Sequence, residues 1–166
     1  METKKRIIKM ANICYIVSKT LYFLSFVVCL AFIVLAISLS ATNAIKSMSK
    51  AETAVLFGTL ALYSFFYIGL LWNVESLFKS ILDKQSPFND GVSHYLMKIA
   101  IFIILVSTIP ALAGSICLRL ICPETEMTFP IEVGGIVSGL VLFLLGMFFT
   151  YGKELQKESD ETLWLY

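Results

Sequence analysis

Charged residues are scarce in this chain of 166 residues. Asp, Glu, Lys and Arg make up 15% of it, against about a quarter in soluble domains. Apolar residues make up 58%, and the mean hydropathy is +0.83. The net charge of +1 gives no reason to expect direct binding to nucleic acid. A chain with so little charge is expected to have lipid around much of its surface.

Four stretches contain no Asp, Glu, Lys or Arg at all. They are Thr20 to Ile45, Thr53 to Asn73, Ile99 to Leu118 and Val133 to Gly152. A helix of about 20 apolar residues crosses the ~30 Å hydrocarbon core, and it bonds its own backbone groups internally. The sequence therefore predicts one domain, residues 1–166, which is an all-α integral membrane protein with a bundle of four transmembrane helices.

Basic residues are divided unequally between the two ends of the predicted spans. With four spans, both termini and the connection between spans 2 and 3 lie on one side, which carries ten of the 13 Lys and Arg residues. The other side carries Lys46, Lys50 and Arg119. By the positive-inside rule the richer side is cytoplasmic. We therefore expect a cytoplasmic-membrane protein with both termini inside and a cytoplasmic helical hairpin between spans 2 and 3.

Residues that usually carry chemistry are few. The single histidine, His94, falls near the cytoplasmic start of the third span, and the sequence has no HExxH or P-loop motif. No charged residue falls within a predicted span, which argues against a proton-coupled transporter but leaves a path for a neutral solute open. Cys14 and Cys29 belong to the first span and the segment before it, whereas Cys117 and Cys122 lie at the start of the second outer loop. Four metal ligands are therefore not expected to meet. Cys117 and Cys122 would form a disulfide only if the helix unwinds between them. We expect no enzyme activity, cofactor or metal.

Small residues mark helix faces that can approach one another closely. Gly135 and Gly139 form a GxxxG pair in the fourth span, and Ser107, Ala111 and Ser115 follow the same four-residue step in the third. Such faces allow close backbone packing in a membrane. We expect them to pack helices within the chain, with a homo-oligomer contact as the alternative.

The connection between spans 2 and 3 is polar and contains a proline. It reads SILDKQSPFND from Ser80 to Asp90. Pro87 disfavours helix at the residue before it, so a capped turn between two helices is expected. The C-terminal tail is charged and then apolar over its last four residues, Leu163 to Tyr166. Because the hairpin and the tail are both predicted to be cytoplasmic, we expect that they can form one docking surface.

The segments ILDKQSPFN in the hairpin and YGKELQKESDETL in the tail resemble a bacterial family of four-span membrane proteins, domain of unknown function 2975. The resemblance covers nearly the whole chain. The matching positions are Pro87, Phe88, Gly152, Leu155, Gln156, Asp160, Glu161 and Thr162. The resemblance supplies no established activity, but members of the family often accompany a small helix-turn-helix regulator of the Cro/repressor type. It therefore implies a bacterial inner-membrane protein with a cytoplasmic regulator as its partner.

The sequence thus predicts a non-enzymatic bacterial membrane protein that docks or regulates a cytoplasmic partner. The residues expected to carry docking are Asp83, Lys84, Pro87, Phe88, Asp160, Glu161 and Trp164. Two alternatives stay open. The chain could be a transport or immunity component for a small solute or peptide, in which case the face of Gly135 and Gly139 is the functional one. It could also be an accessory subunit of a larger membrane complex.

Overall fold

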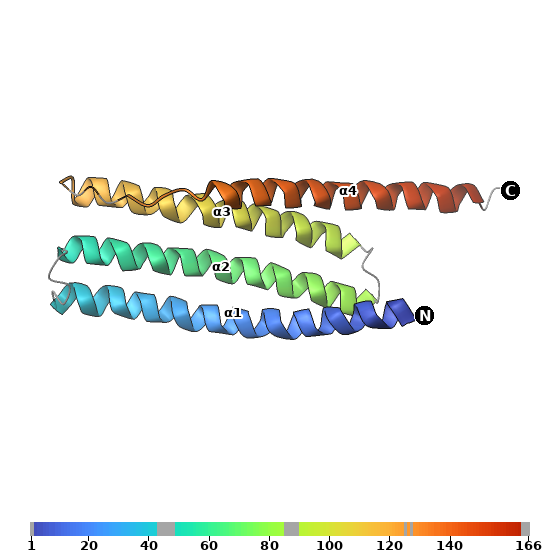
Figure 1. The fold of residues 1–166 in the computed structure, drawn as a ribbon, viewed down its shortest axis with the longest axis horizontal. Coiled ribbons are helices and arrows are strands. Elements are labelled where there is room, and N and C mark those ends of the chain that lie inside the picture. The colour runs from blue at the N-terminus through green and yellow to red at the C-terminus, as the bar shows by residue number, and fades with distance from the viewer. Residues whose placement is uncertain (1, 43–48, 85–89, 125, 127, 164–166) are drawn as a thin grey trace.

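The computed structural model describes residues 2–42, 49–84, 90–124, 126 and 128–163. These residues form four α-helices, which are α1 (Glu2–Thr42), α2 (Lys50–Lys84), α3 (Asp90–Ile121) and α4 (Val133–Leu163) (Figure 1). Each helix is long and apolar enough to cross a membrane. The prediction of an all-α chain with four candidate membrane spans, in contact with a lipid bilayer, is confirmed at this level.

All four helices extend well beyond their charge-free stretches at one end of the molecule. This end holds the start of α1, the end of α2, the start of α3 and the end of α4, and we call it the inner end because the sequence predicts it to be cytoplasmic; the opposite end is the outer end. The added turns of α1, α2 and α3 pack around a small apolar core. Its buried members are Ala11, Leu77, Ile81, Val92 and Ile99. Leu77 and Ile81, in the part of α2 beyond its charge-free stretch, are therefore used for packing.

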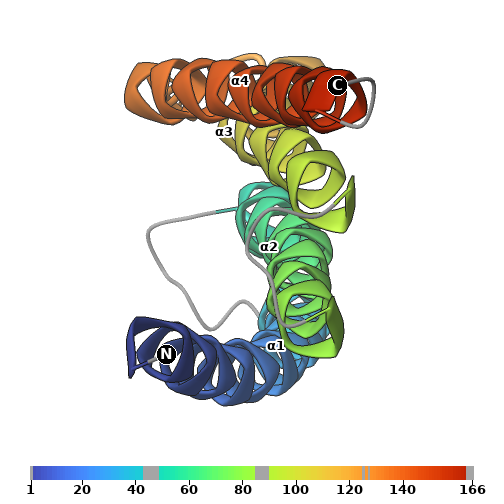
Figure 2. The same cartoon turned by 90° about the vertical axis from the view of Figure 1, so that its right-hand side faces the viewer.

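The helices form an open row, and this differs from the predicted bundle. In the described part of the chain α1 contacts α2, α2 contacts α3, and α3 contacts α4, with no contact between any other pair of helices. Viewed along the helices, the row bends into an open curve (Figure 2). A closed bundle is not required here, because lipid tails are as apolar as the side chains that face them. Phe23 of α1, for example, is 69% exposed.

The fourth helix is displaced along the third. Gly135 lies against Ser107 in the middle of α3, and Gly146 already lies against Met97, near the start of α3. At 1.5 Å of rise per residue, the part of α4 beyond about residue 151 extends past Asp90, where α3 begins. Figure 1 shows α4 starting beside the middle of α3 and projecting beyond it at the inner end. The inner half of α3 is therefore the half that α4 covers.

An extended segment, residues 128–132, lies on the outer half of α3. Ser115 Oγ accepts a hydrogen bond from the N–H of Phe129 (3.1 Å) and donates one to its carbonyl oxygen (3.4 Å). The carbonyl oxygen of Ser107 accepts a hydrogen bond from the N–H of Glu132 (3.3 Å). Ser107 and Ser115 both belong to the third charge-free stretch, so residues 128–132 lie at the depth of the third candidate span. Non-helical backbone is tolerated at that depth where it packs on protein.

The position of Glu132 adds to what the sequence predicts. The sequence predicts that no charged residue falls within the four charge-free stretches, and Glu132 directly precedes the fourth. Its backbone N–H is bonded to Ser107, near the middle of the third stretch. This level follows from the displacement of α4 along α3.

Candidate functional site

The residues predicted to bind a partner belong to elements that point toward the inner end. Asp83 and Lys84 are exposed in the last turn of α2, and Asp160 and Glu161 belong to the last turns of α4, of which only the backbone is described. Three predicted residues lie outside the described part of the chain: Pro87, Phe88 and Trp164. α2 and α4 do not touch within the described residues. The described parts of the hairpin and the tail are therefore separate.

The small residues predicted to pack helices lie where α3 meets α4 and the extended segment. Gly135 rests on the side chain of Ser107, Gly139 is buried, and Ala111 is wholly buried. Ser115 holds the extended segment through its two hydrogen bonds. These residues fix the position of α4 within the chain, so they determine which part of α4 projects at the inner end.

An exposed apolar stripe continues along α4 toward the inner end. It consists of Phe148, Tyr151 and Leu155, which are 69%, 60% and 47% exposed. Their steps of three and four residues place them on one side of the helix, and the glycine face lies on the other. Gly146 is level with Met97, and the third charge-free stretch begins two residues later, at Ile99. The stripe follows Gly146 along α4, so it lies on the inner side of the boundary of the third stretch. We refer to these three residues as the α4 stripe.

The sequence analysis singled out the end of the tail and missed the α4 stripe. Phe148 and Tyr151 fall inside a run that is apolar on every side, so their spacing carries no signal in the sequence. Only the displacement of α4 along α3 shows that they lie level with residues that precede the third charge-free stretch.

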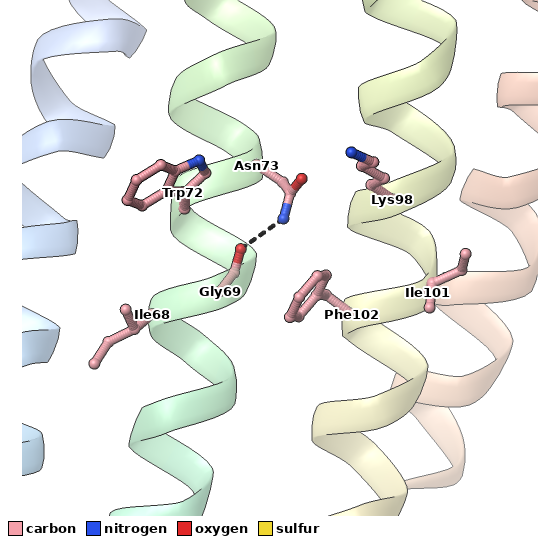
Figure 3. Close-up of a pocket in the computed structure, with 7 residues that line it drawn as sticks. All are labelled: Ile68, Gly69, Trp72, Asn73, Lys98, Ile101 and Phe102. Atoms are coloured by element: carbon pink, nitrogen blue, oxygen red, sulfur yellow. Dashed lines mark hydrogen bonds between the residues drawn. The ribbon is translucent and has the colours of Figure 1, made fainter.

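A groove opens between α2 and α3 at their inner ends (Figure 3). Its volume is about 380 Å³, within the range of about 300–1,000 Å³ that is usual for small-molecule sites. It is lined by Ile68, Gly69, Trp72 and Asn73 of α2 and by Lys98, Ile101 and Phe102 of α3. In the sequence these residues mark only the ends of two spans, so the groove could not be predicted.

The groove is polar toward the inner end of the molecule, which we call its mouth, and apolar toward the outer end, which we call its floor. The Lys98 ammonium and the Asn73 amide point toward one another across the mouth in Figure 3. Asn73 Nδ2 donates a hydrogen bond to the carbonyl oxygen of Gly69 (2.8 Å), and Lys98 Nζ lies 5.9 Å from the centre of the Tyr95 ring. At the floor, the ring of Phe102 lies so close to Gly69 that a methyl group there would collide with it.

A pocket at the outer end is lined by six residues, which are Ser49, Glu52, Ile121, Cys122, Pro123 and Glu124, and the place of Glu52 in it is explained by a helix cap. The N–H of Ser49 donates to Glu52 Oε2 (2.7 Å), and the N–H of Glu52 donates to Ser49 Oγ (3.2 Å), which is a capping box for α2.

All four cysteines are free thiols, so Cys117 and Cys122 are not paired. Within the described residues no three His, Cys, Asp or Glu side chains gather as a metal site would require.

The chain matches no family model, no curated protein and no solved structure. The functional proposal below therefore rests on the geometry of its own residues and on the sequence resemblance given above. Among the described residues, the α4 stripe and the groove between α2 and α3 expose apolar surface toward the inner end.

Proposed function

We propose that the chain is a non-enzymatic membrane protein that holds a soluble cytoplasmic protein at the membrane through the inner part of α4. The observation that carries the proposal is the displacement of α4 along α3. It places the α4 stripe on the inner side of the boundary at Ile99, where the third charge-free stretch begins. Leu155 is also the last residue of the candidate span in α4, Val133–Leu155, so the stripe runs up to the inner boundary of that span. Contiguous exposed apolar patches at such a boundary mark interaction sites.

The shape of the stripe favours a particular kind of partner. Apolar residues at steps of three and four residues along one helix face are the anchors of helix-in-groove recognition. Lys153 and Glu154 are exposed on the same stretch of α4, so the partner groove is expected to be apolar with a polar rim. The resemblance to a family that accompanies a helix-turn-helix regulator favours such a regulator as the partner.

The proposal is tested by photocrosslinking in intact cells. A p-benzoylphenylalanine residue at Leu155 is expected to form a covalent product with a soluble helix-turn-helix regulator, identified by mass spectrometry and reproduced with the purified regulator. Adding Tyr151→Ser is expected to lower the yield at least about tenfold, because burying an aromatic side chain contributes more than 1.4 kcal/mol. The control is the same crosslinker at Lys157, on the opposite side of the helix.

A matched variant separates loss of docking from loss of folding. Leu140→Ser removes an apolar side chain of α4 that is similarly exposed but lies at membrane depth, so it is expected to keep the crosslink. Products that contain only a second copy of the chain or other membrane proteins would contradict docking of a soluble protein. So would a yield that Tyr151→Ser leaves unchanged.

A further inference from the structure

We infer that the groove between α2 and α3 binds an anionic phospholipid from the leaflet that the inner end faces. The groove opens between two helices that are candidate membrane spans, so bilayer lipid is the molecule in direct contact with it. Its lining changes from polar to apolar along the direction into the membrane. A phospholipid has the same order, with its charged headgroup at the boundary and its acyl chains below.

The depth of each lining residue follows from the sequence. Asn73 is the last residue of the second charge-free stretch, and Lys98 directly precedes the third. These two residues therefore mark one level, the inner edge of the hydrocarbon core. Gly69 and Phe102 lie four residues further along their helices, about 6 Å deeper at 1.5 Å per residue. The floor of the groove is thus at acyl-chain depth and its mouth at headgroup depth.

The charge at the mouth selects an anion. Lys98 is the single charged residue among those that line the groove, and no acidic residue lines it. A lysine near the membrane surface favours anionic lipid by about fivefold. The Asn73 amide faces Lys98 across the mouth, where its oxygen can accept a hydrogen bond from a headgroup hydroxyl.

Trp72 lines the groove at the level of the mouth, with its ring on the side of α2 that faces α1. It is 60% exposed, and its ring packs edge to face on Tyr22 of α1, with 5.9 Å between the ring centres. Tryptophan is enriched at membrane interfaces because its ring is apolar and its N–H is polar. A soluble anion such as phosphate would meet Lys98 but would leave the apolar floor at Phe102 uncovered. The floor therefore favours a lipid over a free anion.

The same tryptophan supplies the measurement. In a Trp164→Phe background Trp72 is the single tryptophan of the chain. The full chain is reconstituted in phosphatidylcholine vesicles that contain a fixed fraction of either brominated phosphatidylglycerol or brominated phosphatidylcholine, and bromine quenches nearby tryptophan fluorescence. Relative binding constants from quenching are expected to favour phosphatidylglycerol by about fivefold.

Four variants decide whether the preference belongs to the groove. Lys98→Gln is expected to bring the ratio close to one, whereas Lys98→Arg retains it. Lys79→Gln removes an exposed positive charge of α2 outside the groove and is expected to leave the ratio unchanged. Gly69→Leu keeps Lys98 but fills the floor, so it is expected to lower the preference, with thermal unfolding as the check on folding.

Three results would overturn the inference. Equal quenching by the two brominated lipids in the parent chain would show that the site has no anion preference. If the preference for phosphatidylglycerol survives Lys98→Gln, the anion binds outside the groove. If Lys98→Gln and Lys79→Gln lower the preference equally, it arises from the general positive charge of the inner end. Neither of the last two results would bear on docking through the α4 stripe, which none of these variants alters.

Discussion

Replacing Gly139 with leucine is expected to detach α4 from α3 and to lower the free energy of unfolding by about 3 kcal/mol. A side-chain carbon at this position would lie 2.6 Å from Cγ1 of Ile104 and 2.9 Å from the carbonyl oxygen of Ala100. The second of these atoms belongs to the backbone, so it cannot move aside unless α3 itself shifts. Helices in a membrane associate largely through such close packing, because lipid provides no hydrophobic drive for association.

The measurement is unfolding in mixed detergent micelles, followed by protease cleavage in α4. Gly134→Leu is the matched control, because nothing lies within 4 Å of a side-chain carbon at Gly134. It is expected to change the unfolding free energy by less than about 0.5 kcal/mol. If the two variants unfold alike, the contact at Gly139 does not hold α4. Because this contact also fixes the α4 stripe beyond α3, Gly139→Leu is expected to abolish the crosslink from Leu155 as well.

Removing the hydroxyl of Ser115 is expected to lower the free energy of unfolding by about 2 kcal/mol. Ser115→Ala leaves the N–H and the carbonyl oxygen of Phe129 without the oxygen to which both are bonded. These groups lie beside the third charge-free stretch, where water is scarce, so an unsatisfied N–H is costly. The amide of Phe129 is expected to exchange its hydrogen faster, which hydrogen-exchange mass spectrometry of residues 128–132 measures.

Ser138→Ala is the control for this prediction. The hydroxyl of Ser138 is exposed and donates to the carbonyl oxygen of Gly134 (2.8 Å), within its own helix. Removing it is expected to change the unfolding free energy by less than about 0.5 kcal/mol and to leave exchange at residues 128–132 unaltered. Faster exchange in both variants would mean that loosening of α4, rather than loss of the Ser115 hydroxyl, exposes the segment.

The four helices could be predicted from the sequence, whereas their arrangement could not. Long charge-free stretches are a strong signal, because a charge is costly in hydrocarbon. Packing leaves no comparable signal, since a side chain that faces lipid is as apolar as one that faces a helix. Phe23 and Ala100 are both apolar residues of a predicted span, yet Phe23 is exposed and Ala100 is wholly buried. The open row therefore appears only in three dimensions.

The same limit applies to the candidate sites. The hairpin and the tail could be predicted as surfaces because their polarity contrasts with the spans beside them. Trp72 and Lys98 show no such contrast, since each reads as an ordinary residue at the end of a span. The groove exists because α2 and α3 bring those ends to one level. The position of the α4 stripe likewise depends on how far α4 is displaced along α3, which is fixed where Gly135 and Gly146 contact α3.

The start of α4 in the middle of α3 also has an electrical consequence. The exposed Glu132 side chain lies near the level of Ser107, about halfway along the third charge-free stretch. A unit charge that crosses a membrane potential gains about 2.3 kcal/mol per 100 mV, so a charge halfway across feels about 1 kcal/mol per 100 mV. In a bilayer that α3 crosses as the sequence predicts, the transmembrane voltage would act on a charge at Glu132 and, through it, on α4, which begins at the next residue.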